Sequence, residues 1–126
     1  MKFDWRRFTE TDYNKYIKKR NAGVIDCEDY IGSVFVGDIS IDLVDFGEEN
    51  LLNYDFYVPH EDTGYGYKDG IPYDYADGDG MDTPYGLSYD EFKDRAEILF
   101  KIYIANNDKC CGYSLVEHAN RQLEIW

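Results

Sequence analysis

The chain has 126 residues, of which 44% are hydrophobic and 17% aromatic, and its net charge is −13 at pH 7. This length predicts a single domain, residues 1–126, and the apolar content is too high for a disordered chain. A strongly acidic protein repels nucleic acids and membrane surfaces, so the charge argues against direct binding to DNA, RNA or lipid.

The charge is unevenly distributed along the sequence. Residues 1–22 hold seven basic and three acidic residues, whereas residues 23–94 hold two basic and nineteen acidic ones. An acidic segment of this size speeds encounters with a basic macromolecule. Two alternatives are that the acids serve solubility or that some of them neutralise the basic N-terminal segment.

Location and redox state follow from two further features. No stretch approaches the roughly 18 apolar residues of a membrane span, and MKFDWRRFTE lacks the apolar run of a signal peptide. We therefore expect a cytoplasmic protein, in a bacterial host. The three cysteines are expected to be reduced thiols there.

The first predicted helix lies in residues 8–23. Thr9 and Asp12 have the spacing of a capping box, and Gly23 follows the expected end. Four basic residues near the end of this segment favour the negative pole of the helix. The sequence therefore predicts a helix with a basic exposed surface.

The next part of the chain has the period of β-strands. Residues 38–46 and 51–58 alternate apolar with polar side chains, and 47–50 (GEEN) is a plausible hairpin turn. Residues 30–37 provide an earlier strand, so we expect an antiparallel sheet of three or more strands. Its exposed face is predicted to carry Asp38, Asp42 and Asp55.

Residues 59–87 hold all three prolines and six glycines. We interpret this segment as a long, ordered Gly/Tyr/Asp loop that could pair one short strand at the sheet edge. Ser88 and Glu91 then begin a strong amphipathic helix, and Ser114 with Glu117 begins a final helical segment. About three helices and an antiparallel sheet indicate an α+β fold.

Two sets of residues in the sequence are candidate metal sites. The segment DGDGMD is similar to acidic calcium loops, with Asp77, Asp79 and Asp82 as candidate ligands, but an EF-hand register puts glycine at the essential twelfth position. A zinc site would combine four residues far apart in sequence, and their spacing is unlike that of common zinc motifs. Those four residues are Cys27, Cys110, Cys111 and His118.

Catalytic signals are weak. A thiol enzyme could pair Cys110 or Cys111 with His118, yet no orienting group, oxyanion-hole signature or phosphate-binding glycine loop accompanies them. We therefore expect a protein that is not an enzyme and needs no cofactor. A small zinc-binding protein or thiol enzyme stays open as one alternative, and a phage structural or assembly protein as another.

Binding to a basic protein is better supported. Tyrosine contributes large contact area with few torsions, and carboxylates satisfy arginine and lysine through charge-assisted hydrogen bonds. A nucleic-acid-binding protein presents such cations, so carboxylates can stand where phosphates would. The predicted contact residues are Glu48, Glu49, Tyr65, Tyr67, Tyr73, Asp74, Tyr75, Asp77, Asp79 and Asp82.

The chain shows two resemblances, of which the first brings no assigned activity. The segments DTGYGYKDGIPYDYADG and GYSLVEHANRQLEIW resemble parts of uncharacterised short proteins from phages and mobile elements of Gram-positive bacteria. In size and charge the chain is similar to phage-encoded anti-CRISPR proteins, several of which obstruct the DNA-binding channel of an RNA-guided nuclease. The likeness implies an inhibitor but assigns no site residues. We expect a monomer or homodimer that acts as a DNA mimic.

Overall fold

The fold is described by a computed structural model, which covers residues 1–23, 29–59, 67–68, 71–108 and 114–121. Its strands form one sheet in the order β1-β2-β3-β4-β6-β5, and every neighbouring pair is antiparallel. The predicted α+β class is therefore confirmed. The elements are β1 (Phe3–Asp4), α1 (Glu10–Asn21), β2 (Asp29–Val36), β3 (Ile39–Asp45), β4 (Leu51–Pro59), β5 (Tyr67–Lys68), β6 (Ile71–Asp82), α2 (Tyr89–Asn106) and α3 (Leu115–Ala119).

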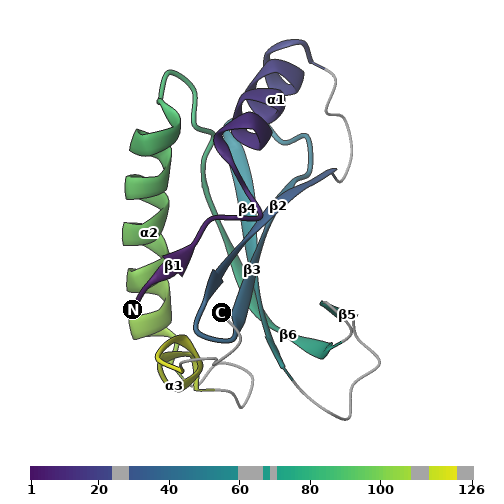
Figure 1. Cartoon of the computed structure of the whole chain (residues 1–126). Coiled ribbons are helices and arrows are strands. Elements are labelled where there is room, and N and C mark those ends of the chain that lie inside the picture. The colour runs from purple at the N-terminus through teal and green to yellow at the C-terminus, as the bar shows by residue number, and fades with distance from the viewer. Residues whose placement is uncertain (24–28, 60–66, 69–70, 109–113, 122–126) are drawn as a thin grey trace.

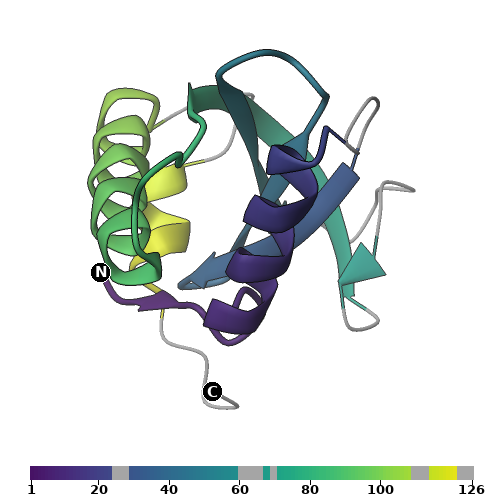
Figure 2. The ribbon, with the colours of Figure 1, turned by 90° about the horizontal axis from the view of Figure 1, so that it is seen from above.

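The helices pack on one face of the twisted sheet. Figures 1 and 2 show α2 lying along the sheet, with α1 near one end of it and α3 near the other. Tyr13 of α1 stacks on Phe92 of α2 at 5.2 Å, and Leu115 of α3 is fully buried in the same core. Among the described residues, none of the helices combines the length and apolarity needed to cross a membrane.

The predicted helix starts are confirmed. Thr9 with Asp12, and Ser88 with Glu91, form reciprocal capping boxes in which each side chain accepts a backbone N–H of the other residue. Ser114 accepts the N–H of Glu117 and so caps α3, which ends at Ala119. These local bonds satisfy amide groups that have no partner inside the helix.

The β2–β3 hairpin closes through the two residues Gly37 and Asp38, because Val36 pairs with Ile39. Gly37 has φ +57, and a Cβ there would lie 2.0 Å from the carbonyl oxygen of His118. Glycine is therefore required at position 37 for two reasons: the backbone is left-handed, and α3 approaches closely.

The segment predicted as a loop contains the longest strand, β6. It pairs with β4 from Leu51↔Asp82 to Pro59↔Tyr73, with a bulge at Ala76. Aspartate and glycine disfavour strands, but pairing with a complete neighbouring strand overrides that preference. A Cβ at Gly78 would lie 2.2 Å from an Asp55 carboxylate oxygen, so a larger residue there would require the Asp55 side chain to move. The prediction of a loop was therefore wrong for residues 71–82, which form β6.

Candidate functional site

Four predicted contact residues are exposed acids, which we call the outer acids: Glu48, Glu49, Asp79 and Asp82. The two glutamates lie in the β3–β4 turn, as predicted. Asp82 ends β6 beside that turn, because it pairs with Leu51 and the next residue donates its N–H to the Asn50 carbonyl oxygen. In the part of the chain that the structure describes, no lysine or arginine forms an ion pair with any outer acid.

Asp79 lies near a tyrosine of the sheet. Burial, followed by the nearby Asp79 carboxylate, raises the pKa of Tyr54 to about 12. Asp79 also accepts the N–H of Gly80 at 2.8 Å. Neither neighbour is a cation, so the negative charge of Asp79 is left uncompensated by these contacts.

The two other predicted acids of β6 are less exposed. Asp77 accepts a hydrogen bond from the Tyr103 hydroxyl of α2 and another, at 2.9 Å, from the N–H of Gly78. Asp74 is half-buried and pairs with Val58. Asp77 therefore joins the sheet to α2, and its loss is expected to disturb the fold as well as any binding.

The predicted tyrosines have different environments. Tyr73 is buried and donates to the carbonyl oxygen of Asp38 at 3.0 Å, which suits a structural role. Tyr75 is 39% exposed and meets Tyr57 edge-on at 5.6 Å. Tyr65 lies outside the described residues, and Tyr67 is placed only as a member of β5.

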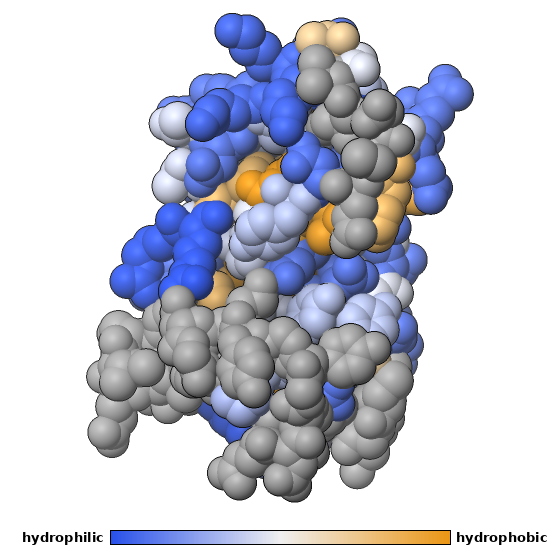
Figure 3. All heavy atoms as spheres, turned by 90° about the vertical axis from the view of Figure 1, so that its right-hand side faces the viewer, coloured by the Kyte–Doolittle hydropathy of each residue, from blue (hydrophilic) through white to orange (hydrophobic). Residues whose placement is uncertain are grey.

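The sheet face away from the helices carries aromatic and polar side chains. Tyr30 on β2 is 54% exposed, and the Tyr57–Tyr75 pair lies across β4 and β6 on the same face. Figure 3 views the molecule from the side opposite α2 and shows pale and orange side chains between hydrophilic ones. Tyrosine-rich surfaces of this kind are common in protein interfaces.

A second group of acids is buried, and we call its members the inner acids: Asp38, Asp42 and Asp45. Asp45 is fully buried at the end of β3. It accepts from the Tyr16 hydroxyl at 2.7 Å, from Arg20 at 2.9 Å and from the N–H of Gly47 at 2.8 Å. Burial, and then the bond to Asp45, raises the pKa of Tyr16. Asp45 thus fixes α1 to the sheet.

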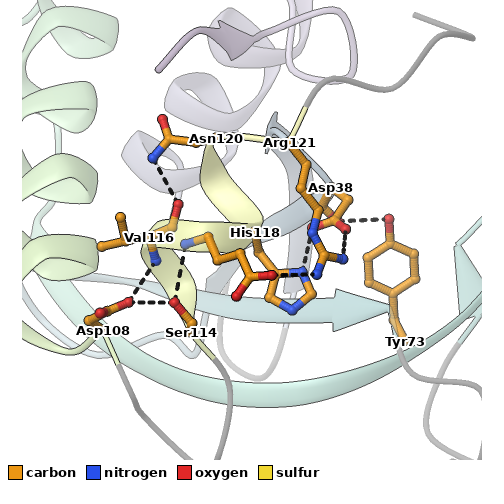
Figure 4. Close-up of polar contacts among 9 residues, drawn as sticks. Asp38, Tyr73, Asp108, Ser114, Val116, His118, Asn120 and Arg121 are labelled. Carbon is orange, nitrogen blue, oxygen red and sulfur yellow. Dashed lines mark hydrogen bonds and ion pairs between the residues drawn. The ribbon is translucent and has the colours of Figure 1, made fainter.

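Asp38 holds α3 in a similar way. Its carboxylate contacts Nδ1 of His118 at 2.7 Å and accepts from Arg121 at 2.9 Å, while its N–H donates to the His118 carbonyl oxygen. Figure 4 shows these groups converging between α3 and the β2–β3 turn, with Tyr73 beside them. The hydrogen bond to Asp38 raises the pKa of Arg121.

Asp42 lies on the open face of β3 but is only 9% exposed. Ser33 and Ser40 donate to one of its carboxylate oxygens at 2.9 and 3.1 Å. The prediction that Asp38 and Asp42 are exposed is therefore wrong, whereas Asp55 is half-buried. A sequence signal existed for one inner acid: the alternation of Ile39, Ile41 and Leu43, continued by one step, puts Asp45 on the buried face.

The metal and thiol alternatives gain no support. Cys27, Cys110 and Cys111 lie outside the described residues, and His118 contacts Asp38. Within the described ranges, no group of three or more His, Cys, Asp or Glu side chains is placed to hold a metal ion. Asp77, Asp79 and Asp82, the candidate calcium ligands, are spread along a strand instead of forming a loop.

The helix α2 lies next to β6 and carries two exposed isoleucines. Arg95 donates to the carbonyl oxygen of Asp82 at 2.6 Å and Tyr103 bonds Asp77, so α2 runs along β6. Ile98 and Ile102, one turn apart, are 59% and 52% exposed. Ile102 follows Arg95 by seven residues, close to two helical turns, and therefore projects from the same side of the helix.

No protein family, curated protein or solved structure matches the chain.

Proposed function

We propose that the protein is an acidic inhibitor that occupies the basic, nucleic-acid-binding surface of another protein. The observation that carries this proposal is the exposure of the four outer acids with no described lysine or arginine paired to them. The partner class we put forward is an RNA-guided CRISPR nuclease, whose DNA channel is lined with cations.

Several other charged residues of the chain are paired within the fold. This contrast supports a role of the outer acids in binding a partner. Lys19 pairs with Asp29, and Arg20 and Arg121 pair with the inner acids. The basic residues named here thus neutralise acids that stabilise the molecule, while the outer acids keep their charge exposed. Residues 71–82 hold four acidic residues and no basic one. Such a field attracts a cationic surface over about one Debye length, ~8 Å at physiological salt.

Exposed aromatic area supplies the short-range part of the interaction. Tyr75, with Tyr57 packed against it, provides apolar surface and a hydroxyl, and tyrosine rings also accept arginine or lysine over their faces. Charge alone gives fast but weak association, whereas buried aromatic area slows dissociation.

The test measures DNA binding by a guide-RNA-loaded nuclease in a mobility-shift assay. We expect the protein to block DNA binding, with an effect that decreases as salt rises. The variant that neutralises all outer acids (Glu48→Gln, Glu49→Gln, Asp79→Asn, Asp82→Asn) should inhibit about tenfold less or worse.

A matched control removes the same charge elsewhere. The residues Glu10, Asp90, Asp94 and Glu117 are also exposed, and their neutralisation should leave inhibition nearly intact. Equal loss in both variants would show that only net charge matters. That result, or inhibition that is insensitive to salt, would refute the proposed site.

A further inference from the structure

We propose that Tyr85 is the aromatic anchor of this interface and receives an arginine side chain of the basic partner, whose charged head reaches the outer acids beside it. This inference rests on the proposed function and names the chemical group that is held. It concerns the end of the sheet where α1 lies. The β3–β4 turn (residues 46–50) and the β6–α2 connection (residues 83–88) meet there (Figure 1).

Hydrogen bonds join the two connections. The N–H of Thr83 donates to the carbonyl oxygen of Asn50 at 3.3 Å. The guanidinium of Arg20, on α1, also bridges them: Nε donates to the Tyr85 hydroxyl at 3.1 Å, and Nη2 donates to the carbonyl oxygen of Glu48. Because Nε and Nη2 belong to one edge of a planar group, the Tyr85 hydroxyl lies beside Glu48.

Arg20 is itself held in place, and it therefore orients Tyr85. Its Nη1 donates to the Asp45 carboxylate at 2.9 Å, and the two side chains are only 9% and 0% exposed. An inner acid thus neutralises Arg20, whereas Glu48 offers it a backbone oxygen and keeps its carboxylate charge. A side chain oriented before binding loses less conformational entropy when the partner arrives.

Two exposed aromatic residues lie in these connections. Tyr85 is 47% exposed, and Phe46 in the β3–β4 turn is 40% exposed. Tyrosine and arginine are the residues that most often dominate the binding energy of protein interfaces, and they tend to meet each other across the contact. Tyr85 is the ring of this pair that has a fixed position, so we assign the anchor to Tyr85.

The charges around Tyr85 select a cation as its occupant. Glu48 lies beside the Tyr85 hydroxyl, Glu49 is the next residue of the turn, and Asp82 ends β6 at the start of the β6–α2 connection. Arginine suits this site better than lysine, because a guanidinium stacks flat on an aromatic ring and meets a carboxylate through two parallel hydrogen bonds.

The probe is a capped glycine-serine peptide that carries two arginines, titrated into isotopically labelled protein at low salt. Nuclear magnetic resonance should show shifts of the Tyr85 ring protons and of the amides of Glu48 and Glu49. The same peptide with lysine in place of arginine has equal charge, and we expect it to bind about threefold more weakly because it stacks less well on the ring.

Two substitutions of Tyr85 separate the ring from its orientation. Tyr85→Ala removes the ring and should weaken binding of the arginine peptide about tenfold. Tyr85→Phe keeps the ring but lacks the hydroxyl that Arg20 holds, so we expect a smaller loss, about threefold. Ile98→Ala is the control, because Ile98 is 59% exposed but lies in the middle of α2; this variant should bind normally.

The same variants are then compared in the mobility-shift assay with the guide-RNA-loaded nuclease. Tyr85→Ala should inhibit DNA binding about tenfold less than the unaltered protein, and Ile98→Ala should inhibit equally well. Tyr85 carries no charge at neutral pH, so its effect on inhibition is independent of the net charge of the protein.

Three results would overturn the anchor. The first is equal peptide binding by Tyr85→Ala and the unaltered protein, and the second is equal binding of the arginine and lysine peptides. The third is a shift of the Tyr85 ring protons with protein concentration alone, which would identify a second copy as the occupant. If the anchor fails while neutralising the outer acids still abolishes inhibition, the proposed function stands. If the unaltered protein does not inhibit the nuclease, the proposed function falls and the peptide titration still decides this inference.

Discussion

The inner and outer acids have the same chemistry but opposite surroundings. Asp45 is fully buried and accepts from a tyrosine, an arginine and a backbone amide. Asp82 and Glu49 are exposed and no described cation pairs with them. The first kind fixes a helix to the sheet, and the second leaves its charge available. The net charge of the chain therefore overstates the number of acidic side chains that can contact a partner.

The strongest test of this contrast removes the most buried acid. Asp45→Ala leaves Arg20 and the Tyr16 hydroxyl without their shared acceptor, and α1 loses its attachment to β3. Removing one member of a buried ion pair costs about 3 kcal/mol or more. We expect that loss in the free energy of unfolding, measured by urea denaturation followed by circular dichroism. A decrease in the free energy of unfolding as small as that of Asp82→Ala would contradict the distinction between inner and outer acids.

A smaller effect is expected at the other helix attachment. Asp38→Ala removes the acceptor for Arg121 and the contact of His118, but the Arg121 side chain is 44% exposed and can be solvated by water. Hydrogen bonds to a charged group contribute about 2 kcal/mol, which is the loss we expect in urea denaturation. Hydrogen exchange should increase first in α3. Glu117→Gln, which alters only the exposed side of Arg121, is the control.

Local sequence patterns predicted the α+β class, the capped starts of α1 and α2, and the turn holding Glu48 and Glu49. These features depend on residues close together in the chain, such as Ser88 and Glu91. The inner acids depend on partners far away: Asp38 and Arg121 are separated by 83 residues, and no spacing rule brings them together. β6 was missed for a similar reason, since its strand exists only because β4 lies beside it.

Glu91 is intermediate between the inner and outer acids, because it is exposed yet has a defined partner. Its carboxylate accepts the N–H of Ser88, and this bond holds the pKa of Glu91 below its usual value. The stabilisation is therefore present above the ordinary glutamate range and is lost as pH falls through the lowered pKa. Glu91→Gln should flatten the pH dependence of unfolding in that acid range.

Ser88, the other residue of this capping box, shows how much the box contributes to stability. Ser88→Ala removes the side chain that accepts the N–H of Glu91, and loss of an N-cap costs about 1 kcal/mol. Urea denaturation at neutral pH measures it. Ser114→Ala, which uncaps the five-residue α3, is the comparison and should affect only the C-terminal part of the structure.

The smallest effect is expected for the outer acids themselves. Glu49→Gln with Asp82→Asn removes two charges that no described cation neutralises, so the free energy of unfolding should change by less than about 0.5 kcal/mol. Relief of repulsion within residues 71–82 gives any change a stabilising sign at low salt. Clear destabilisation would mean that these carboxylates are held within the fold, because a group kept for a partner contributes nothing to the stability of the free molecule.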